Sequence, residues 1–205
     1  MKTQQIAIIL SIFAIILTSC SNQSRLLANI DSYIQTYPDS AYTELKKYKE
    51  SDFTSRKNRA KYCTLYAIAL DKNYNDTSKF LDTLILYKDY YIHHGSKRDR
   101  MLYNFYLGDQ MSDSGMPESA ITYFSEALKY AITIQDWFYC GIISQWISIL
   151  YAKQYNYNQQ LEYAEKACYY LKKTDKLGHL GDSRIKLAIA YMCKGRTKES
   201  LDLIR

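Results

Sequence analysis

Residues 107–127 read LGDQMSDSGMPESAITYFSEA, and the spacing of small and aromatic residues in this stretch decides the fold. Gly108 and Ala120 are small at the two places where a pair of helices has to cross closely. Gly115 lies between them and is suited to end the first helix and open a turn. Phe124 falls on the second helix, on the side that faces a neighbouring pair. The stretch therefore predicts two antiparallel helices joined by a tight turn.

The same spacing returns twice more at a constant interval. The first copy covers residues 101–134, a looser one residues 141–174, and a clearer one residues 181–205. The later copies keep small or turn-forming residues at Ser148, Ala164, Ala167, Ala188, Gly195 and Ser200. The spacing within each copy is that of a tetratricopeptide repeat (TPR), a helix–turn–helix unit of about 34 residues. The interval between copies is longer than this, which we interpret as helices that are longer by about a turn.

Helical spacing of apolar residues continues upstream of this array. It predicts helices over residues 26–34, 41–48, 58–72 and 79–93. We expect Pro38 to end the first of these helices, Asp39 or Ser40 to cap the second, and Thr77 or Ser78 to cap the last. Nothing alternates with a period of two, so no sheet is expected. The predicted fold class is all-α, a right-handed α-solenoid of about five TPR-like helical hairpins after a cleaved signal peptide.

The amino-terminal residues form a separate segment. It begins with Lys2, continues with an apolar run over residues 6–17 and ends in Leu17-Thr18-Ser19-Cys20. This is the order of a secretory signal peptide, and the apolar run is too short to cross a bilayer as a helix. The ending resembles a bacterial lipobox, which implies that Cys20 becomes the first mature residue and carries acyl chains. The alternative is an ordinary signal peptide in which Cys20 is incidental.

Taken together, the chain resembles a group of bacterial envelope lipoproteins with TPR repeats. The resemblance is carried by the lipobox, by Pro38-Asp39-Ser40-Ala41, by Leu70-Asp71-Lys72-Asn73-Tyr74 and by the Leu107–Ala127 repeat. We expect a lipoprotein signal peptide in residues 1–19, a lipidated tether in 20–25, degenerate TPR-like hairpins in 26–100 and TPR repeats in 101–205, the last one incomplete. Two readings of the incomplete repeat stay open: an open reading frame that is truncated relative to its relatives, or an edge that a partner covers.

Composition sets further bounds. Glycine and proline are scarce, with 7 and 2 residues, whereas tyrosine is abundant, with 22 residues, and suits the seams between amphipathic helices. The net charge of +6 is spread along the chain. The cysteines other than Cys20 match no disulfide framework and no metal pair; they are Cys63, Cys140, Cys168 and Cys193. We expect reduced, buried thiols, with a disulfide between Cys168 and Cys193 as the alternative.

Signals for catalysis are nearly absent. His93 and His94 have no third metal ligand at a suitable spacing, and we interpret them as polar residues at a helix end. No phosphate-binding loop, nucleophile elbow or zinc-protease motif occurs in the sequence. The basic cluster Lys97-Arg98-Asp99-Arg100 is too short for nucleic acid and is interpreted as the solvated first turn of a helix. The sequence predicts no enzyme, no cofactor, no metal site and no nucleic-acid partner.

A binding groove is the remaining candidate. In TPR arrays the first helix of each pair lines a concave groove that holds peptides. The repeat frame assigns to this groove Phe105, Asp109, Ser112, Asp113, Gln145, Ile149, Ala152, Lys153, Ile185 and Ile189. The expected partner is an unknown protein or peptide. The alternative is that Phe105 and Ile149 pack within the array itself.

The leading functional hypothesis is a lipid-anchored adaptor that binds a protein or peptide in the cell envelope. No acidic retention signal follows Cys20, so we expect an outer-membrane location that faces the periplasm. One alternative is the sensory part of a membrane signalling or transcriptional regulator. A second is a glycan-handling envelope lipoprotein of the starch-utilisation type. A third, on the short stretch Tyr37-Pro38-x-Ser40-x-Tyr42, is a five-TPR lipoprotein of outer-membrane assembly.

Overall fold

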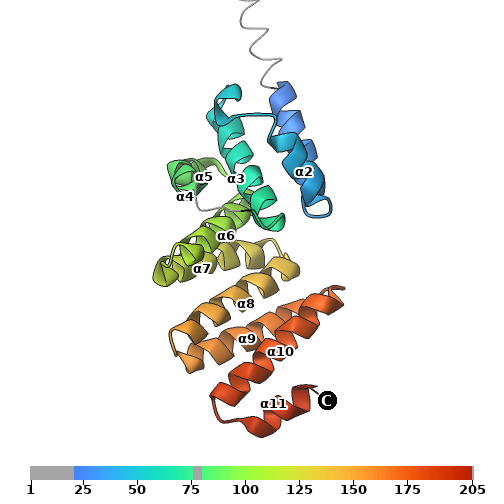
Figure 1. Cartoon of the computed structure of the whole chain (residues 1–205), viewed down its shortest axis with the longest axis vertical. Coiled ribbons are helices and arrows are strands. Elements are labelled where there is room, and N and C mark those ends of the chain that lie inside the picture. The colour runs from blue at the N-terminus through green and yellow to red at the C-terminus, as the bar shows by residue number, and fades with distance from the viewer. Residues whose placement is uncertain (1–20, 76–79, 205) are drawn as a thin grey trace, which may run out of the picture. The chain divides into compact units, whose positions relative to one another are not determined.

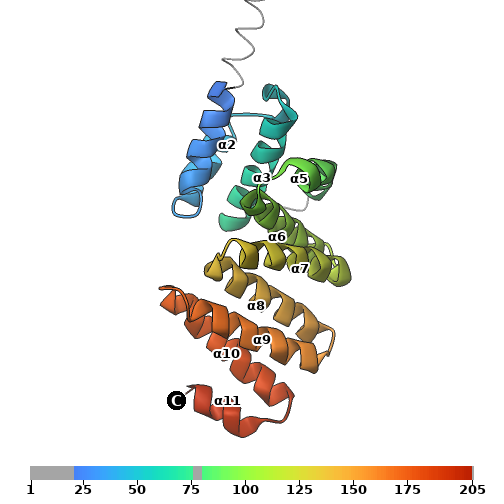
Figure 2. The same cartoon turned by 180° about the vertical axis from the view of Figure 1, so that it is seen from behind.

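The computed structural model describes residues 21–75 and 80–204. Helices make up most of these residues, and no β-strand occurs among them. The chain forms two compact units, the first ending at Tyr90 and the second beginning at Tyr91 (Figures 1 and 2). The predicted all-α fold of TPR-like hairpins is confirmed. The signal peptide and Cys20 lie outside the described residues, and the division into a tether and two repeat regions stays a prediction.

Three helical hairpins follow one another in the second unit (Figure 1). They are α6 (Lys97–Asp113) with α7 (Pro117–Thr133), α8 (Trp137–Lys153) with α9 (Tyr157–Leu171), and α10 (Leu177–Cys193) with α11 (Thr197–Ile204). Their first residues follow one another at equal intervals, so the hairpins repeat with the period that the sequence predicts. Helices α6, α7, α8 and α10 have 17 residues each, which accounts for the length beyond a usual repeat.

The turns inside the three hairpins share one backbone conformation. Gly115, Tyr155 and Gly195 have positive φ angles of 73°, 56° and 71°. In each turn the following N–H closes back on the helix, as when the Met116 N–H donates to the Met111 carbonyl over 2.8 Å. This is the bonding of a Schellman motif, which ends a helix with one residue in the left-handed region. The turn positions predicted at Gly115 and Gly195 are therefore confirmed, and Tyr155 has the same conformation in the middle hairpin.

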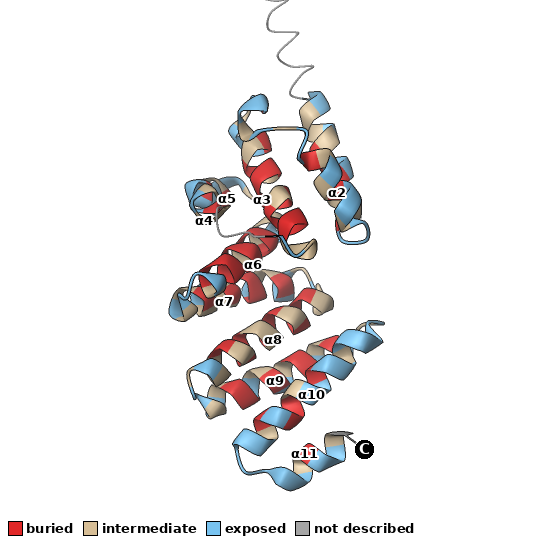
Figure 3. Ribbon diagram, viewed as in Figure 1, coloured by how far each residue is buried: buried red, intermediate tan, exposed pale blue. Residues whose placement is uncertain are grey.

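Close helix crossing explains the small residues of the repeat. A Cβ atom added to Gly108 on α6 would lie 2.9 Å from the Phe124 ring on α7, so only glycine fits there without a shift. Ala120 and Ala127 on α7 are fully buried. Phe124 also stacks on Trp146 of the next hairpin, with ring centroids 6.4 Å apart. Its predicted role in contacting the neighbouring pair is confirmed, and Figure 3 shows the buried residues along these helix seams.

At a second crossing, the larger residue lies on the first helix in one repeat and on the second helix in the next. In the middle hairpin, Gly141 on α8 faces Leu171 on α9, and a Cβ atom on Gly141 would lie 2.4 Å from the leucine Cγ. The equivalent residues one repeat earlier are Met101 and Ala131, both fully buried. The first helix thus carries the large residue in one hairpin and the small residue in the next.

The first unit also consists of packed helices. Residues 21–33 are helical, followed by α2 (Pro38–Leu45), the short 3₁₀ helix η1 (Glu50–Asp52), α3 (Arg56–Lys72) and α4 (Leu81–Leu86). Helix α5 (Lys88–His94) begins in the first unit and ends in the second. Its fully buried residues include Leu27, Ile30, Ile34, Ala41, Leu45, Leu65 and Ile68. The Lys61 ammonium on α3 lies 2.9 Å from the Asp31 carboxylate, which ties the first helix to α3 across the seam.

Two local predictions in this unit are wrong. The helix expected over residues 79–93 is divided into α4 and α5 at Tyr87. The buried Tyr87 ring and the hydrogen bond from its hydroxyl to the Glu50 carboxylate hold the chain in a tighter turn there. Asp39 and Ser40, expected to cap the second helix, lie inside α2, whose N-cap is Tyr37 without a side-chain hydrogen bond. Pro38 is the first helical residue, where its missing N–H costs nothing. The caps expected from Thr77 or Ser78 lie outside the described residues.

The cysteines follow the prediction with one exception. Cys63, Cys140 and Cys168 are buried free thiols, whereas Cys193 is a free thiol that is exposed at the last residue of α10. The Cys168 sulfur lies 3.2 Å from the Ser183 hydroxyl oxygen. Ser183 and Cys193 are ten residues apart on α10, which is about 15 Å along a helix. The Cys168 thiol, which lies beside Ser183, is therefore too far from the Cys193 thiol to form a disulfide.

We predict that Gly141→Ala lowers the free energy of unfolding of the second unit by about 1–3 kcal/mol, because the added methyl group overlaps Leu171. The matched control is Gly181→Ala at the same position of the next repeat, where no atom lies within 4 Å. There alanine should raise stability by about 0.5–1 kcal/mol through helix propensity. Urea denaturation followed by circular dichroism measures the free energy of unfolding of both variants. Equal changes would contradict the close contact between Gly141 and Leu171.

We also predict selective thiol labelling in a Cys20→Ser variant. Burial raises the pKa of Cys63 and of Cys140 to about 12, so these thiols stay protonated and unreactive through pH 9. The exposed Cys193 should react with iodoacetamide within minutes, and the buried thiols only after denaturation. Peptide mass spectrometry locates the label, and rapid modification of Cys63 or Cys140 in the native state would oppose this packing.

Candidate functional site

The predicted groove residues of α6 are largely covered. Phe105 and Asp109 are buried, Ser112 is half-buried and Asp113 is exposed. The Phe105 ring lies 5.6 Å from the ring centroids of both Phe124 and Tyr139. Phe105 therefore packs within its own hairpin and against the next one, which is the alternative that the sequence left open. The structure does not offer Phe105 or Asp109 to a partner as a surface.

The predicted groove residues of α8 are partly accessible. Gln145, Ile149 and Ala152 are half-buried, and Lys153 is exposed at the last residue of the helix. The Gln145 Nε2 atom is buried without a hydrogen-bond partner among the described residues. Among the predicted groove residues, the exposed fraction of the side chains thus rises from α6 to α8.

The predicted groove residues of α10, Ile185 and Ile189, are exposed, and we call them the α10 strip. Ile185 is 58% exposed and Ile189 is 50% exposed, at spacings that place them on one side of the helix. Other large apolar residues of this hairpin that sequence reasoning missed are also exposed: Leu177, Met192 and Leu201. Met192 continues the spacing of Ile185 and Ile189 by a further three residues, a periodic signal that the sequence contains. Nothing in the sequence distinguishes these residues from buried ones, because their exposure depends on which helices pack against α10.

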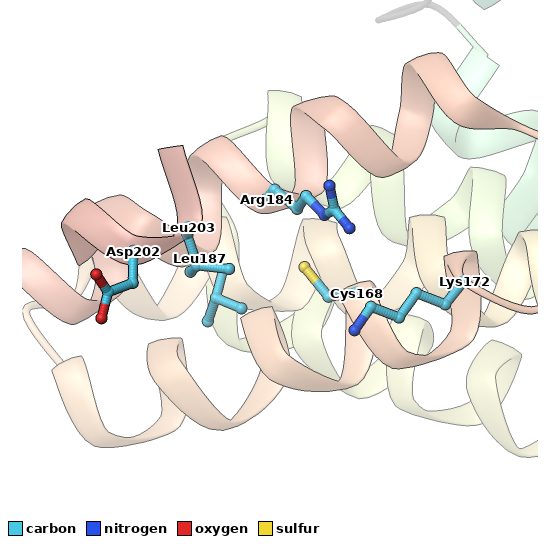
Figure 4. Close-up of a pocket in the computed structure, with 6 residues that line it drawn as sticks. All are labelled: Cys168, Lys172, Arg184, Leu187, Asp202 and Leu203. Carbon is cyan, nitrogen blue, oxygen red and sulfur yellow. The ribbon is translucent and has the colours of Figure 1, made fainter. Parts of the chain in front are cut away.

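Two adjoining hollows lie beside these residues. The larger, of about 430 Å³, is lined by Leu177, Gly178, Gly181, Asp182, Arg184, Ile185 and Leu203. The smaller, of about 250 Å³, lies where α9, α10 and α11 meet and is lined by Cys168, Lys172, Arg184, Leu187, Asp202 and Leu203 (Figure 4). Because Arg184 and Leu203 line both, the hollows form one groove, which we call the α10 groove. Its lining combines apolar side chains (Leu177, Ile185, Leu187 and Leu203) with charged ones (Lys172, Asp182, Arg184 and Asp202).

The charges on the rim are separated along the groove. Figure 4 shows Lys172 and Arg184 on either side of the Cys168 sulfur, with Asp202 at the other end of the hollow. Lys172 and Arg184 form no ion pair with the described part of the chain. Burial raises the pKa of Cys168, although its hydrogen bond with Ser183 and the two cations oppose this rise. The thiol is therefore protonated at neutral pH, and the groove offers contact and charge rather than a nucleophile.

No arrangement suited to a metal ion occurs in residues 21–75 and 80–204, where no group of three or more His, Cys, Asp or Glu side chains comes together. His93 and His94 are exposed in the last turn of α5, as predicted for polar residues at a helix end. The first unit has its own hollow of about 280 Å³, lined by Glu50, Arg56, Arg59, Leu86 and Tyr87. Two of its polar groups are already bonded, since Glu50 accepts from Tyr87 and Arg59 donates to the Phe53 carbonyl.

Known structures support the fold. BtubC from P. vanneervenii matches with a TM-score of 0.63 at 13% identity, over 91% of this chain and 87% of that chain. The STAND protein with a tetratricopeptide repeat sensor from Pyrococcus horikoshii matches with a TM-score of 0.63 at 20% identity, over 89% of this chain and 29% of that chain. MamA of AMB-1 matches with a TM-score of 0.57 at 13% identity, over 89% and 94%. No family model and no curated protein matches the sequence.

These similarities show that the chain has a TPR-type fold. At identities of 13–20% they concern the fold alone and assign no activity. Within the described residues, none of the helices combines the length and the hydropathy that crossing a membrane requires.

We predict that the exposed strip contributes little to stability. Ile185→Ala should change the free energy of unfolding by no more than about 0.5 kcal/mol, because the side chain is mostly in water already. Ile147→Ala, at a fully buried position of α8, should cost about 2–5 kcal/mol. Urea denaturation of both variants tests this, and a large loss for Ile185→Ala would place that residue in the core.

Proposed function

We propose that this chain is a lipid-anchored adaptor of the bacterial cell envelope whose second unit binds a protein. The proposal that the second unit binds a protein is supported by the apolar strip on α10, where the side chains of Ile185 and Ile189 are at least half exposed. Removing apolar surface from water lowers the free energy by about 25 cal/mol for each Å² that a partner covers. A contiguous exposed strip beside a charged rim is typical of an interaction surface.

The TPR-type fold supports this proposal. A solenoid displays the same helix faces repeatedly, which gives an extended surface built from rigid elements. The groove lacks an ionised nucleophile and a metal cluster among the described residues, so binding is the role that its side chains support best. The rim adds specificity, because the positive charges of Lys172 and Arg184 favour an acidic partner surface.

The anchor rests on the sequence. The lipobox-like Leu17-Thr18-Ser19-Cys20 after a short apolar run supports cleavage before Cys20 and acylation of its sulfur and amino group. Two or more acyl chains hold a protein on a bilayer stably, whereas one chain gives marginal binding. With no acidic residue directly after Cys20, our proposal locates the mature protein on the outer membrane, facing the periplasm.

The anchor and the strip are tested together in the native membrane. Wild-type protein should incorporate radiolabelled palmitate and sediment with membranes, and Cys20→Ser should lose both. Site-specific photo-crosslinkers at Ile185 and at the control position Thr122, an exposed residue of α7, report on binding. We expect a discrete crosslinked protein from Ile185 and none from Thr122. Equal crosslinking from both positions, or an unlabelled soluble protein, would contradict the proposal.

A sensory role is the second candidate. It is favoured by the similarity to a STAND protein whose TPR region is described as a sensor, of which this chain matches 29%. The same α10 strip then binds a signal rather than a structural partner. The two functions differ in occupancy: a scaffold keeps its partner constitutively, whereas a sensor exchanges it when the stimulus changes. Crosslinking from Ile185 under varied growth conditions separates them.

A further inference from the structure

The first helix begins directly beside the proposed anchor. Residues 21–33 are helical, and Ser21 is joined to Cys20 by one peptide bond. A peptide bond spans about 3.8 Å between Cα atoms and a helix rises about 1.5 Å per residue, so Ser24 lies within about 10 Å of the anchoring residue. The Ser24 hydroxyl donates to the Asn58 side chain, in the first turn of α3, over 2.9 Å. The start of α3 is therefore held close to the anchor.

The segment between η1 and α3 is fixed at the same end of the unit. The Gln23 Nε2 atom donates to the Asp52 carbonyl over 2.8 Å, and the Gln23 Oε1 atom accepts from the Thr54 N–H over 3.1 Å. Figures 1 and 2 show that the first helix and α3 both begin at this end. We call residues 21–25 and 49–59 the proximal end of the first unit.

The proximal end is basic. It contains two acidic residues and five basic ones, a net charge of +3; the basic residues are Arg25, Lys49, Arg56, Lys57 and Arg59. Arg25, Arg56 and Lys57 are exposed and form no ion pair with the described part of the chain. The partial positive charges at the amino-terminal ends of the first helix and of α3 add to this charge. The proximal end thus presents positive charge that the protein itself does not neutralise.

This charge is confined to one end of the unit. The other described residues of the first unit, 26–48, 60–75 and 80–90, contain five basic and six acidic residues, a net charge of −1. The acidic groups of the proximal end are already bonded, since Glu50 accepts from the Tyr87 hydroxyl and Asp52 accepts from the Lys49 N–H. The first unit is therefore polarised, and its positive end is the one that the anchor holds at the bilayer.

An anionic bilayer surface fits this end. The negative potential of such a surface attracts Lys and Arg side chains within about one Debye length, which is about 8 Å at physiological ionic strength. The short link to Cys20 brings the proximal end to that range. The hollow that Arg56 and Arg59 line also contains Leu86, which is 62% exposed. An apolar side chain beside cations is suited to the boundary between headgroups and acyl chains.

We infer that the proximal end of the first unit docks on the anionic phospholipid headgroups of the membrane that carries the anchor. The first helix and α3 then hold their amino-terminal ends against the bilayer. Each Lys or Arg near the surface strengthens this contact about five-fold. The inference rests on the proposed acylation of Cys20, because the acyl chains bring the proximal end to the bilayer, and it adds a second contact that orients the unit.

The experiment measures how close the proximal end is to the headgroups. Acylated protein is reconstituted into vesicles of phosphatidylcholine, or of phosphatidylcholine and phosphatidylglycerol in equal parts, with a nitroxide quencher on some headgroups. A fluorophore is attached at Ser51→Cys in η1, or at Thr36→Cys beyond the far end of the first helix, in a Cys193→Ser background. We expect anionic vesicles to quench the fluorophore at residue 51 more strongly than neutral vesicles do, and to leave the one at residue 36 unchanged.

Charge variants separate docking from mere tethering. Removing three cations of the proximal end should abolish the difference between the two kinds of vesicle; the changes are Arg25→Gln, Arg56→Gln and Lys57→Gln. The matched control removes the same charge from exposed positions of the second unit and should keep the difference; its changes are Lys129→Gln, Lys153→Gln and Lys198→Gln. About 1 M KCl, which shortens the Debye length to about 3 Å, should also abolish the difference. Circular dichroism shows that each variant is folded.

The two kinds of vesicle distinguish failure of the docking from failure of the anchor. Retention on neutral vesicles reports the acyl chains alone, since no surface charge acts there. Protein that stays on both kinds of vesicle with equal quenching at residue 51 would overturn the docking and leave the anchor; this is also the result expected if the basic surface meets an acidic protein instead. Protein that leaves neutral vesicles would contradict the anchor, while quenching on anionic vesicles would still decide the docking.

Discussion

The second unit depends on one steric constraint, the close crossing of the two helices in each hairpin. At Gly108 the approach of the Phe124 ring leaves no room for a Cβ atom, and at Gly141 the side chain of Leu171 fills that room instead. Such crossings fix the distance and the rotation of one helix on the other. Because successive helices begin at equal intervals along the chain, the same relation can recur from one hairpin to the next.

The repeat architecture explains why a surface is open on α10 while equivalent residues are buried on α6. Each hairpin contacts only its neighbours, so a side chain is buried or exposed according to whether a further helix is packed beside it. Phe105 is covered by Phe124 and Tyr139, whereas Ile185 at the same position two repeats later is 58% exposed. The apolar character of the position comes from the repeat, and its exposure is set by which of the described helices pack against it.

The proposed acylation of Cys20 and the exposed apolar residues of α10 complement each other physically. Confinement to a membrane surface would raise the effective concentration of the binding unit near other envelope proteins, so a groove of moderate affinity would suffice.

The sequence by itself determined the helical class, the repeat period and the turn positions, because the spacing of Gly108, Gly115 and Phe124 reflects local geometry that any helix pair must satisfy. It also located the apolar strip through Ile185 and Ile189. It did not determine that α4 and α5 separate at Tyr87, since the Glu50 contact that holds this turn comes from far along the chain. Nor could it separate the buried Phe105 and Asp109 from the exposed Ile185, or the buried Cys168 from the exposed Cys193. Periodicity reports which side of a helix a residue occupies, but only the packing of other helices against that side decides whether the residue is covered.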